Sequence, residues 1–282
     1  MTFTSWRPKV HTKSERILVA AGVDGALNYW NPLNGKLVGS IKPEKKFSDL
    51  LCLDYTKDAT RLAAAGRRKA VKIFDDDKRM LIAKLRPKGQ QKPGHSNRIF
   101  AVKFHSTGKT LITGSWDMTV KVWDVNSGTI AHSIYGPEIN GDAIDLHEDG
   151  DLFITGSHRS KEALQIWSLS YGKLVDTVEW DPDKPNNSSQ ILGAQFEKDG
   201  NKYIVACGSG RNEARLFDKV GSTYTFSCGV ELPSACSSID MAPKQKLLAV
   251  GCCDGICRLF ERVEKSEEVK PSENGVSADL IN

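Results

Sequence analysis

The feature that most constrains the fold of this chain is an internal repeat with a period of 43 to 50 residues. Six short segments share a run of alternating apolar residues that leads to an aromatic residue, and a polar residue usually follows. The aromatic residues are Trp30, Phe74, Trp123, Trp167, Phe217 and Phe260, at successive separations of 44, 49, 44, 50 and 43 residues. A repeat of this length indicates a fold built from copies of one supersecondary unit.

Each copy of the repeat reads as four short strands. The aromatic segment is preceded by a run that ends in glycine or another small residue, such as RLAAAG or TLITGS, and before it by a run such as IFAVKF. A turn and a fourth run follow, as in NGKLVGSIK and SGTIAHSIY. Short alternating runs separated by Asn-Gly, Ser-Gly or Asp-Gly are typical of consecutive hairpins. The sequence therefore predicts an all-β fold of four-stranded antiparallel units, with six units visible and no long amphipathic helix.

Composition and charge exclude several classes of protein. At 282 residues, with 39% hydrophobic and 26% charged residues, the chain has the makeup of a globular protein with a large core. Neither a bilayer-spanning apolar run nor a signal peptide is visible, so we expect a cytoplasmic protein without a membrane partner, and a nuclear or ciliary location is also compatible. A net charge of +4 is mild, and we expect no nucleic-acid partner.

The seven cysteines raise the question of a metal site, because three of them fall in the segment GCCDGIC. Cys252 and Cys253 are adjacent on a predicted strand, so their side chains point to opposite faces. The sequence has no second cysteine pair and no histidine cluster at zinc spacing. We therefore expect no metal and no other cofactor, and free thiols in a reducing compartment.

The third repeat carries two dipeptides that bracket it, Gly94-His95 before its first strand and Trp123-Asp124 at the end of its third. In this the chain resembles the WD40-repeat β-propellers. The resemblance extends from about Thr2 to Arg262 and is strongest in the third repeat, since the other repeats read WN, FD, WS, FD and FE at the second dipeptide. It implies a single propeller domain over residues 1–263. The polar composition of residues 264–282 indicates a disordered tail.

The resemblance also implies a role for four polar and aromatic residues of the third repeat. His95, Asp117, Thr113 and Trp123 are expected to form a structural hydrogen-bond network, and Asp117 stands six residues before Trp123, as in the family. A catalytic interpretation of the histidine, aspartate and threonine would need an activated nucleophile in a cleft with an oxyanion stabiliser. The sequence offers neither, so we expect a protein that is not an enzyme.

Two interpretations of ring closure are open at this stage. Most members of the family close seven blades, often by pairing an N-terminal strand with the last blade, whereas six third-strand signals are visible here. A fourth strand for the last blade would have to come from the residues RVEKSEEVK, which form strands poorly. The chain is either a six-bladed ring with weak closure or part of a longer propeller.

Propellers of this family present loops on both faces, so the resemblance implies a scaffold or adaptor that docks partner proteins or peptides within a multi-protein complex. The alternative is a propeller enzyme, or a binder of small molecules or phosphate, that uses the central channel. Candidate partner-binding residues combine positive charge with aromatic surface in the loops that enter first strands or join second to third strands. These candidates are Arg98, Phe100, Trp116, Arg67, Arg68, Lys161 and Arg211.

Overall fold

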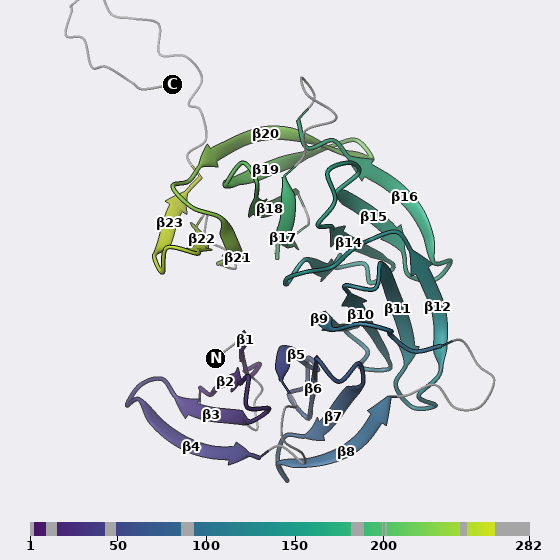
Figure 1. Ribbon diagram of the computed structural model, residues 1–282, viewed down its shortest axis with the longest axis vertical. Coiled ribbons are helices and arrows are strands. Elements are labelled where there is room, and N and C mark those ends of the chain that lie inside the picture. Colours follow the sequence, from purple (N-terminus) through teal and green to yellow (C-terminus); the bar gives the residue numbers. More distant parts are fainter. Residues whose placement is uncertain are drawn as a thin grey trace, which may run out of the picture.

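The computed structural model describes residues 3–9, 16–42, 49–85, 93–181, 189–198, 200, 202–242 and 247–262. Within these ranges the chain forms strands, turns and loops, and no helix there is long and apolar enough to cross a membrane. The strands make six antiparallel sheets that follow one another around a central axis, like the blades of a propeller (Figure 1). The predicted all-β fold with six blades is confirmed. The predicted tail over residues 264–282 lies outside the described residues.

Within each blade the strands run in sequence order from the central axis to the outer edge (Figure 1). The first three blades consist of β1 (Phe3–Trp6), β2 (Leu18–Ala21), β3 (Leu27–Asn31) and β4 (Lys36–Ile41), then β5 (Leu50–Tyr55), β6 (Arg61–Gly66), β7 (Val71–Asp75) and β8 (Met80–Leu85), then β9 (Ile99–Phe104), β10 (Thr110–Ser115), β11 (Thr119–Asp124) and β12 (Ile130–Tyr135).

The last three blades consist of β13 (Ile144–Leu146), β14 (Leu152–Gly156), β15 (Leu164–Ser168) and β16 (Lys173–Val178), then β17 (Gln190–Phe196), β18 (Tyr203–Ser209), β19 (Glu213–Val220) and β20 (Thr223–Glu231), then β21 (Cys236–Met241), β22 (Leu247–Cys252) and β23 (Cys257–Glu261). The sixth sheet has three strands in the described part of the chain, whereas each of the other five has four.

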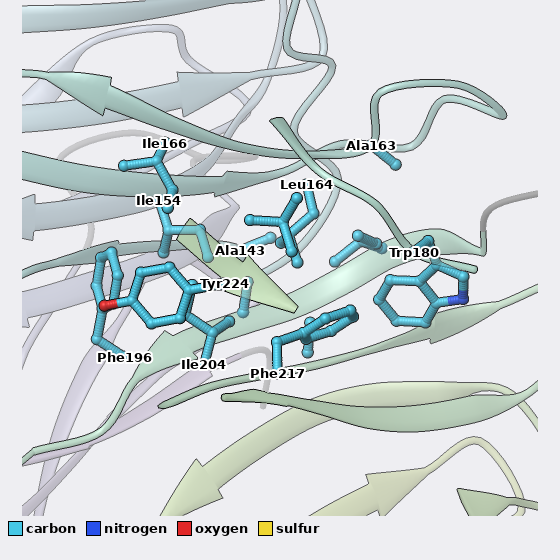
Figure 2. Packing of buried hydrophobic residues seen from close by; sticks show 14 residues of the cluster. Ala143, Ile154, Ala163, Leu164, Ile166, Trp180, Phe196, Ile204, Phe217 and Tyr224 are labelled. Atoms are coloured by element: carbon cyan, nitrogen blue, oxygen red, sulfur yellow. The ribbon is translucent and has the colours of Figure 1, made fainter. Parts of the chain in front are cut away.

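The core of the molecule lies between neighbouring blades, because each sheet buries an apolar face on the next one. Five clusters of buried apolar residues fill the five successive interfaces. From the second blade onward, the repeated aromatic residue belongs to the interface with the preceding blade, as Trp123 does with blade two and Phe217 with blade four. Figure 2 shows Phe217 in the cluster between blades four and five. The 43- to 50-residue period is thus the spacing of blade-to-blade contacts.

The first and sixth blades face each other across an opening in the ring (Figure 1). Among the described residues, no cluster of buried apolar side chains joins these two blades. An open arc of six blades is compatible with both interpretations of ring closure given above, a six-bladed ring with weak closure and part of a longer propeller.

Candidate protein-docking face

One face of the ring gathers the starts of the first strands and the turns that join second to third strands; we call it the loop face. The antiparallel meander puts both features at the same edge of every blade. Backbone hydrogen bonds hold them together: Trp116 N–H donates to Arg98 O over 3.1 Å, and Arg67 N–H donates to Asp49 O over 3.0 Å. Loops far apart in the sequence therefore form one surface.

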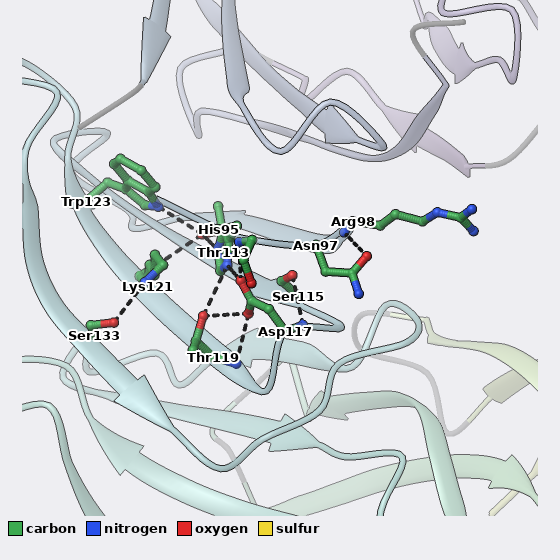
Figure 3. A network of polar contacts seen from close by, with 11 residues as sticks. His95, Asn97, Arg98, Thr113, Ser115, Asp117, Thr119, Lys121, Trp123 and Ser133 are labelled. Carbon is green, nitrogen blue, oxygen red and sulfur yellow. Dashed lines mark hydrogen bonds and ion pairs between the residues drawn. The ribbon is translucent and has the colours of Figure 1, made fainter. Parts of the chain in front are cut away.

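The four residues predicted to form a hydrogen-bond network lie within hydrogen-bond distance of one another in blade three (Figure 3). Trp123 Nε1–H donates to Thr113 Oγ1 over 2.8 Å, Thr113 Oγ1 lies 2.8 Å from His95 Nε2, and His95 Nδ1 lies 3.0 Å from Asp117 Oδ2. Sequence reasoning missed Thr119, whose backbone N–H and hydroxyl both donate to Asp117 Oδ1, over 3.0 and 2.6 Å. We call these five residues the blade-three fastener.

The electrostatics of the fastener favour a neutral imidazole. Burial lowers the pKa of His95 and outweighs the hydrogen bond and charge of Asp117, which act in the opposite direction. Burial alone would raise the pKa of Asp117, but hydrogen bonds from His95, Thr119 and the Ser96 backbone hold it well below its usual range. A proton on His95 Nδ1 satisfies both groups, and the Thr113 hydroxyl then donates to Nε2. Because Thr113 is fully buried, it is no accessible nucleophile.

Blade five uses a different set of buried polar residues, which sequence reasoning missed. Glu213 accepts hydrogen bonds from Trp180 Nε1–H over 2.7 Å and from Arg215 Nε–H over 2.9 Å. Arg215 also donates to Trp180 O over 2.5 Å, and Arg211 pairs with Asp181 at 2.7 Å. The signal that could have revealed this network is the presence of Glu213 and Arg215 two positions apart in the segment EARLF, whose other residues are apolar.

A second buried charged cluster lies near the central channel, on the first strands of blades two to four. Lys103 Nζ lies 3.4 Å from Asp142 Oδ1. Asp54 accepts a hydrogen bond from Phe104 N–H over 2.7 Å, and Asp145 accepts one from Phe196 N–H over 3.0 Å. Each of these two carboxylates thereby ties one blade to the next.

Burial raises the pKa of Asp54 to about 6, and the nearby charge of Lys103 opposes that rise. Burial also raises the pKa of Asp145, again against Lys103. Burial alone would lower the pKa of Lys103, but Asp142 and the other two carboxylates raise it above its usual value. A cavity of about 520 Å³ adjoins these residues, on the side of the ring opposite the loop face. Sequence reasoning missed this cluster because its members lie about one blade apart in the sequence.

Blade three presents exposed aromatic and apolar side chains on the loop face. Trp116 is 42% exposed and contacts Phe100 edge to face, with ring centroids 6.2 Å apart. Its indole N–H donates to Glu138 Oε1. Arg98 is exposed, and Figure 3 shows its side chain projecting away from the fastener. The structure thus brings three of the predicted partner-binding residues, Arg98, Phe100 and Trp116, to one place.

Two exposed residues beside Trp116 were not predicted from the sequence. Met118, in the same turn, is 50% exposed, and Tyr135, at the end of β12, is 72% exposed. Gly136 N–H donates to Met118 O over 2.9 Å, which places the end of β12 against that turn. We call Arg98, Trp116, Met118 and Tyr135 the blade-three patch.

The other predicted partner-binding residues lie in the second-to-third turns of blades two, four and five. Arg67 is exposed, and its Nη1 lies 3.5 Å from Asp49 Oδ2. Arg68 and Lys161 are also exposed. Arg211 is half-buried between two carboxylates of the blade-five network, with Glu213 at 3.7 Å in addition to Asp181. These four residues lie on the same face as the blade-three patch. Arg211 differs from the other three because it is part of the blade-five network.

Comparison with known proteins agrees with this geometry. The family model described as "WD domain, G-beta repeat" matches residues 87–124, the segment that contains the first three strands of blade three and its fastener. A chain in the crystal structure of the mitotic checkpoint complex superposes with a TM-score of 0.74 at 17% identity, over 88% of this chain and 74% of that one. The protein is a WD40-repeat β-propeller. The family predicted from the sequence is confirmed.

Relatives of this WD40 propeller are known from distant organisms. It is 24% identical over 268 residues to the mitotic checkpoint protein bub-3 of Caenorhabditis elegans, covering 87% of this chain and 71% of the relative. It is 24% identical over 264 residues to the target of rapamycin complex subunit LST8 of Mus musculus, covering 86% of this chain and 72% of the relative. Two other relatives are much longer, and the WD40 propeller spans 17% of the length of one and 44% of the other.

Proposed function

We propose that this WD40 propeller is a non-catalytic docking subunit of a multi-protein complex, and that the blade-three patch binds its partner protein or peptide. The observation that carries the proposal is the side-by-side exposure of Trp116, Met118 and Tyr135 next to Arg98. Tryptophan, tyrosine and arginine are the residues that dominate the binding energy of protein interfaces. Methionine adapts its shape to apolar partner surfaces.

The patch is also held in place before any partner arrives. Trp116 is fixed by its ring contact with Phe100 and by its hydrogen bond to Glu138. The turn that carries it is anchored by Asp117, which receives hydrogen bonds from the imidazole of His95 and from Thr119. A surface that is ordered in the free protein loses less conformational entropy on binding. The fastener therefore supports docking without taking part in it.

The names of the relatives support a role in an assembly. The mouse relative is named as a subunit of the target of rapamycin complex, and the structural neighbour is a chain of the mitotic checkpoint complex. We infer that this chain also works as one component of a larger assembly.

A role for the central channel is the second candidate, and the buried cluster around Lys103 is the observation that favours it. Ionisable residues with shifted pKa values in a cavity are a mark of functional sites. Here, however, Asp54 and Asp145 each accept a backbone hydrogen bond from the next blade, so the cluster has a structural purpose. We therefore place docking first and assign no catalytic residue.

The test is affinity capture from cell extract, read by mass spectrometry, with the full-length chain as bait. We expect the double substitution Arg98→Ala and Trp116→Ala to remove the proteins that the wild type enriches, while the melting temperature changes little. The matched control is Tyr171→Ala, which removes a 74% exposed aromatic residue from the opposite face, in the turn between β15 and β16. Unchanged capture by the double variant would refute the assignment of the docking patch.

A further inference from the structure

In the described part of the chain, the outer edge of β23 in the sixth blade is uncovered. In each of the other five blades, a fourth strand covers the equivalent edge. In the described part of the chain, β23 is the last strand of a three-stranded sheet, whereas the third strand of each other blade pairs with a fourth. An uncovered edge presents backbone N–H and C=O groups that are ready to pair with another strand. The question is what kind of strand would fit there.

The fourth strands of the other five blades indicate what kind of strand would fit beside β23, because they share one side-chain pattern. In each fourth strand, a first apolar residue lies opposite the repeated aromatic residue of the third strand. A second apolar residue lies opposite the third-strand residue that stands three positions before that aromatic. Because of a bulge, the two apolar residues are four positions apart on the fourth strand. The pairs are Leu37 and Ile41, Leu81 and Leu85, Ile130 and Ile134, Leu174 and Val178, and Phe226 and Val230.

The two apolar residues of this pattern serve different blade interfaces. In blades two and three the first apolar residue faces the preceding blade: Leu81 packs on the cluster between blades one and two, and Ile130 on the cluster between blades two and three. The second faces the following blade, as Leu85 does between blades two and three and Ile134 between blades three and four. A fourth strand on β23 would therefore point its first apolar residue at blade five.

An apolar cavity lies where that residue would go. It has a volume of about 260 Å³ and is lined by side chains of both blades, among them Leu248 and Phe260 of blade six and Val205, Cys228 and Val230 of blade five. We call it the β23 slot. We propose that the β23 slot accepts an extended strand from a partner polypeptide, which carries apolar residues four positions apart and completes the sixth blade.

The segment of this chain that follows β23 does not carry the pattern. In the first four blades the first apolar residue comes seven residues after the aromatic, as Leu37 does after Trp30. Counting from Phe260 gives Glu267, and four positions later Pro271. A glutamate would bring a charge into an apolar slot, and proline lacks the N–H that a strand ladder uses. In this register, the segment that directly follows β23 therefore does not supply a matching strand, and the proposal assigns the strand to a partner polypeptide.

Thiol trapping on the full-length chain tests the proposal. Cys257 holds the place in β23 that would lie opposite the second apolar residue, and it is exposed, as is Cys253 in the preceding turn. The probe is a peptide with the sequence of residues 171–180, taken from this chain's own β16, in which Val178 is replaced by cysteine. Directly opposed residues of antiparallel strands have Cα atoms about 4.5–5.5 Å apart, a distance that a disulfide spans.

With oxidised glutathione as the oxidant, we expect the peptide to form a disulfide with Cys257 in preference to Cys253, as mapped by mass spectrometry after proteolysis. A control peptide that also carries Leu174→Asp should trap Cys257 roughly ten-fold less, because it has no leucine to bury in the slot. Equal trapping by the two peptides would overturn the proposal. So would a disulfide between Cys257 and the cysteine of a full-length Pro271→Cys variant, because the chain's own segment would then occupy the slot.

Discussion

At the scale of single residues, the dipeptides Gly94-His95 and Trp123-Asp124 of the third repeat contribute unequally to the fold. His95 and Trp123 belong to the buried fastener, whereas Asp124 does not. His95 and Trp123 are buried and joined through the Thr113 hydroxyl. Asp117 accepts hydrogen bonds from His95, from the Ser96 N–H and from Thr119. Asp124, the aspartate of the Trp-Asp pair, is exposed and bonds to Ser127 in its own turn. The sequence pattern predicted which residues form the set, because their spacing follows the repeat, but not that Thr119 completes it.

This difference between the two aspartates predicts a difference in stability. Asp117→Ala should lower the free energy of unfolding by about 1–3 kcal/mol, because it leaves His95 Nδ1–H and the Ser96 N–H without their acceptor. Asp124→Ala should lower it much less, because water replaces the lost hydrogen bonds at an exposed site. Chemical denaturation of both variants measures the difference. Equal losses would contradict the structural role of the fastener.

At the scale of the elements, the repeat predicted the strands well because turns and alternating apolar residues are local signals. The network of blade five escaped prediction because Trp180 and Asp181 lie in the connection before the blade, more than thirty residues from Glu213 and Arg215. The charged cluster around Lys103 escaped for the same reason, since its members come from different blades. Contacts that occur once, between elements that are distant in the sequence, leave no periodic pattern, unlike the aromatic contact that every blade from the second onward repeats.

The blade-five network gives a prediction about paired charges. Glu213→Ala should lower the free energy of unfolding by about 3–5 kcal/mol, because it leaves the Arg215 guanidinium buried with one fewer carboxylate. Adding Arg215→Met should recover part of that loss, since an apolar side chain of similar length needs no counter-charge. Denaturation of the wild type, both single variants and the double variant forms a double-mutant cycle. Strictly additive losses would show that the two residues do not act together.

At the scale of the whole molecule, the six blades form an open arc, and the two proposed binding surfaces, the blade-three patch and the β23 slot, lie on different blades. The sequence predicted the number of blades, because each third strand carries an aromatic residue that packs on the preceding blade. It did not reveal the slot, because an unfilled edge appears only when the register of the other five blades is known.

A crystal structure of the full-length chain tests the central claim most directly, namely that one structural unit is repeated around an axis and that its polar motif is architecture. We predict that Phe74, Trp123, Trp167, Phe217 and Phe260 occupy equivalent positions, each against the preceding blade, with Thr113 enclosed between His95 and Trp123. Aromatic residues in unrelated positions, or a Thr113 hydroxyl open to solvent beside His95, would contradict the account.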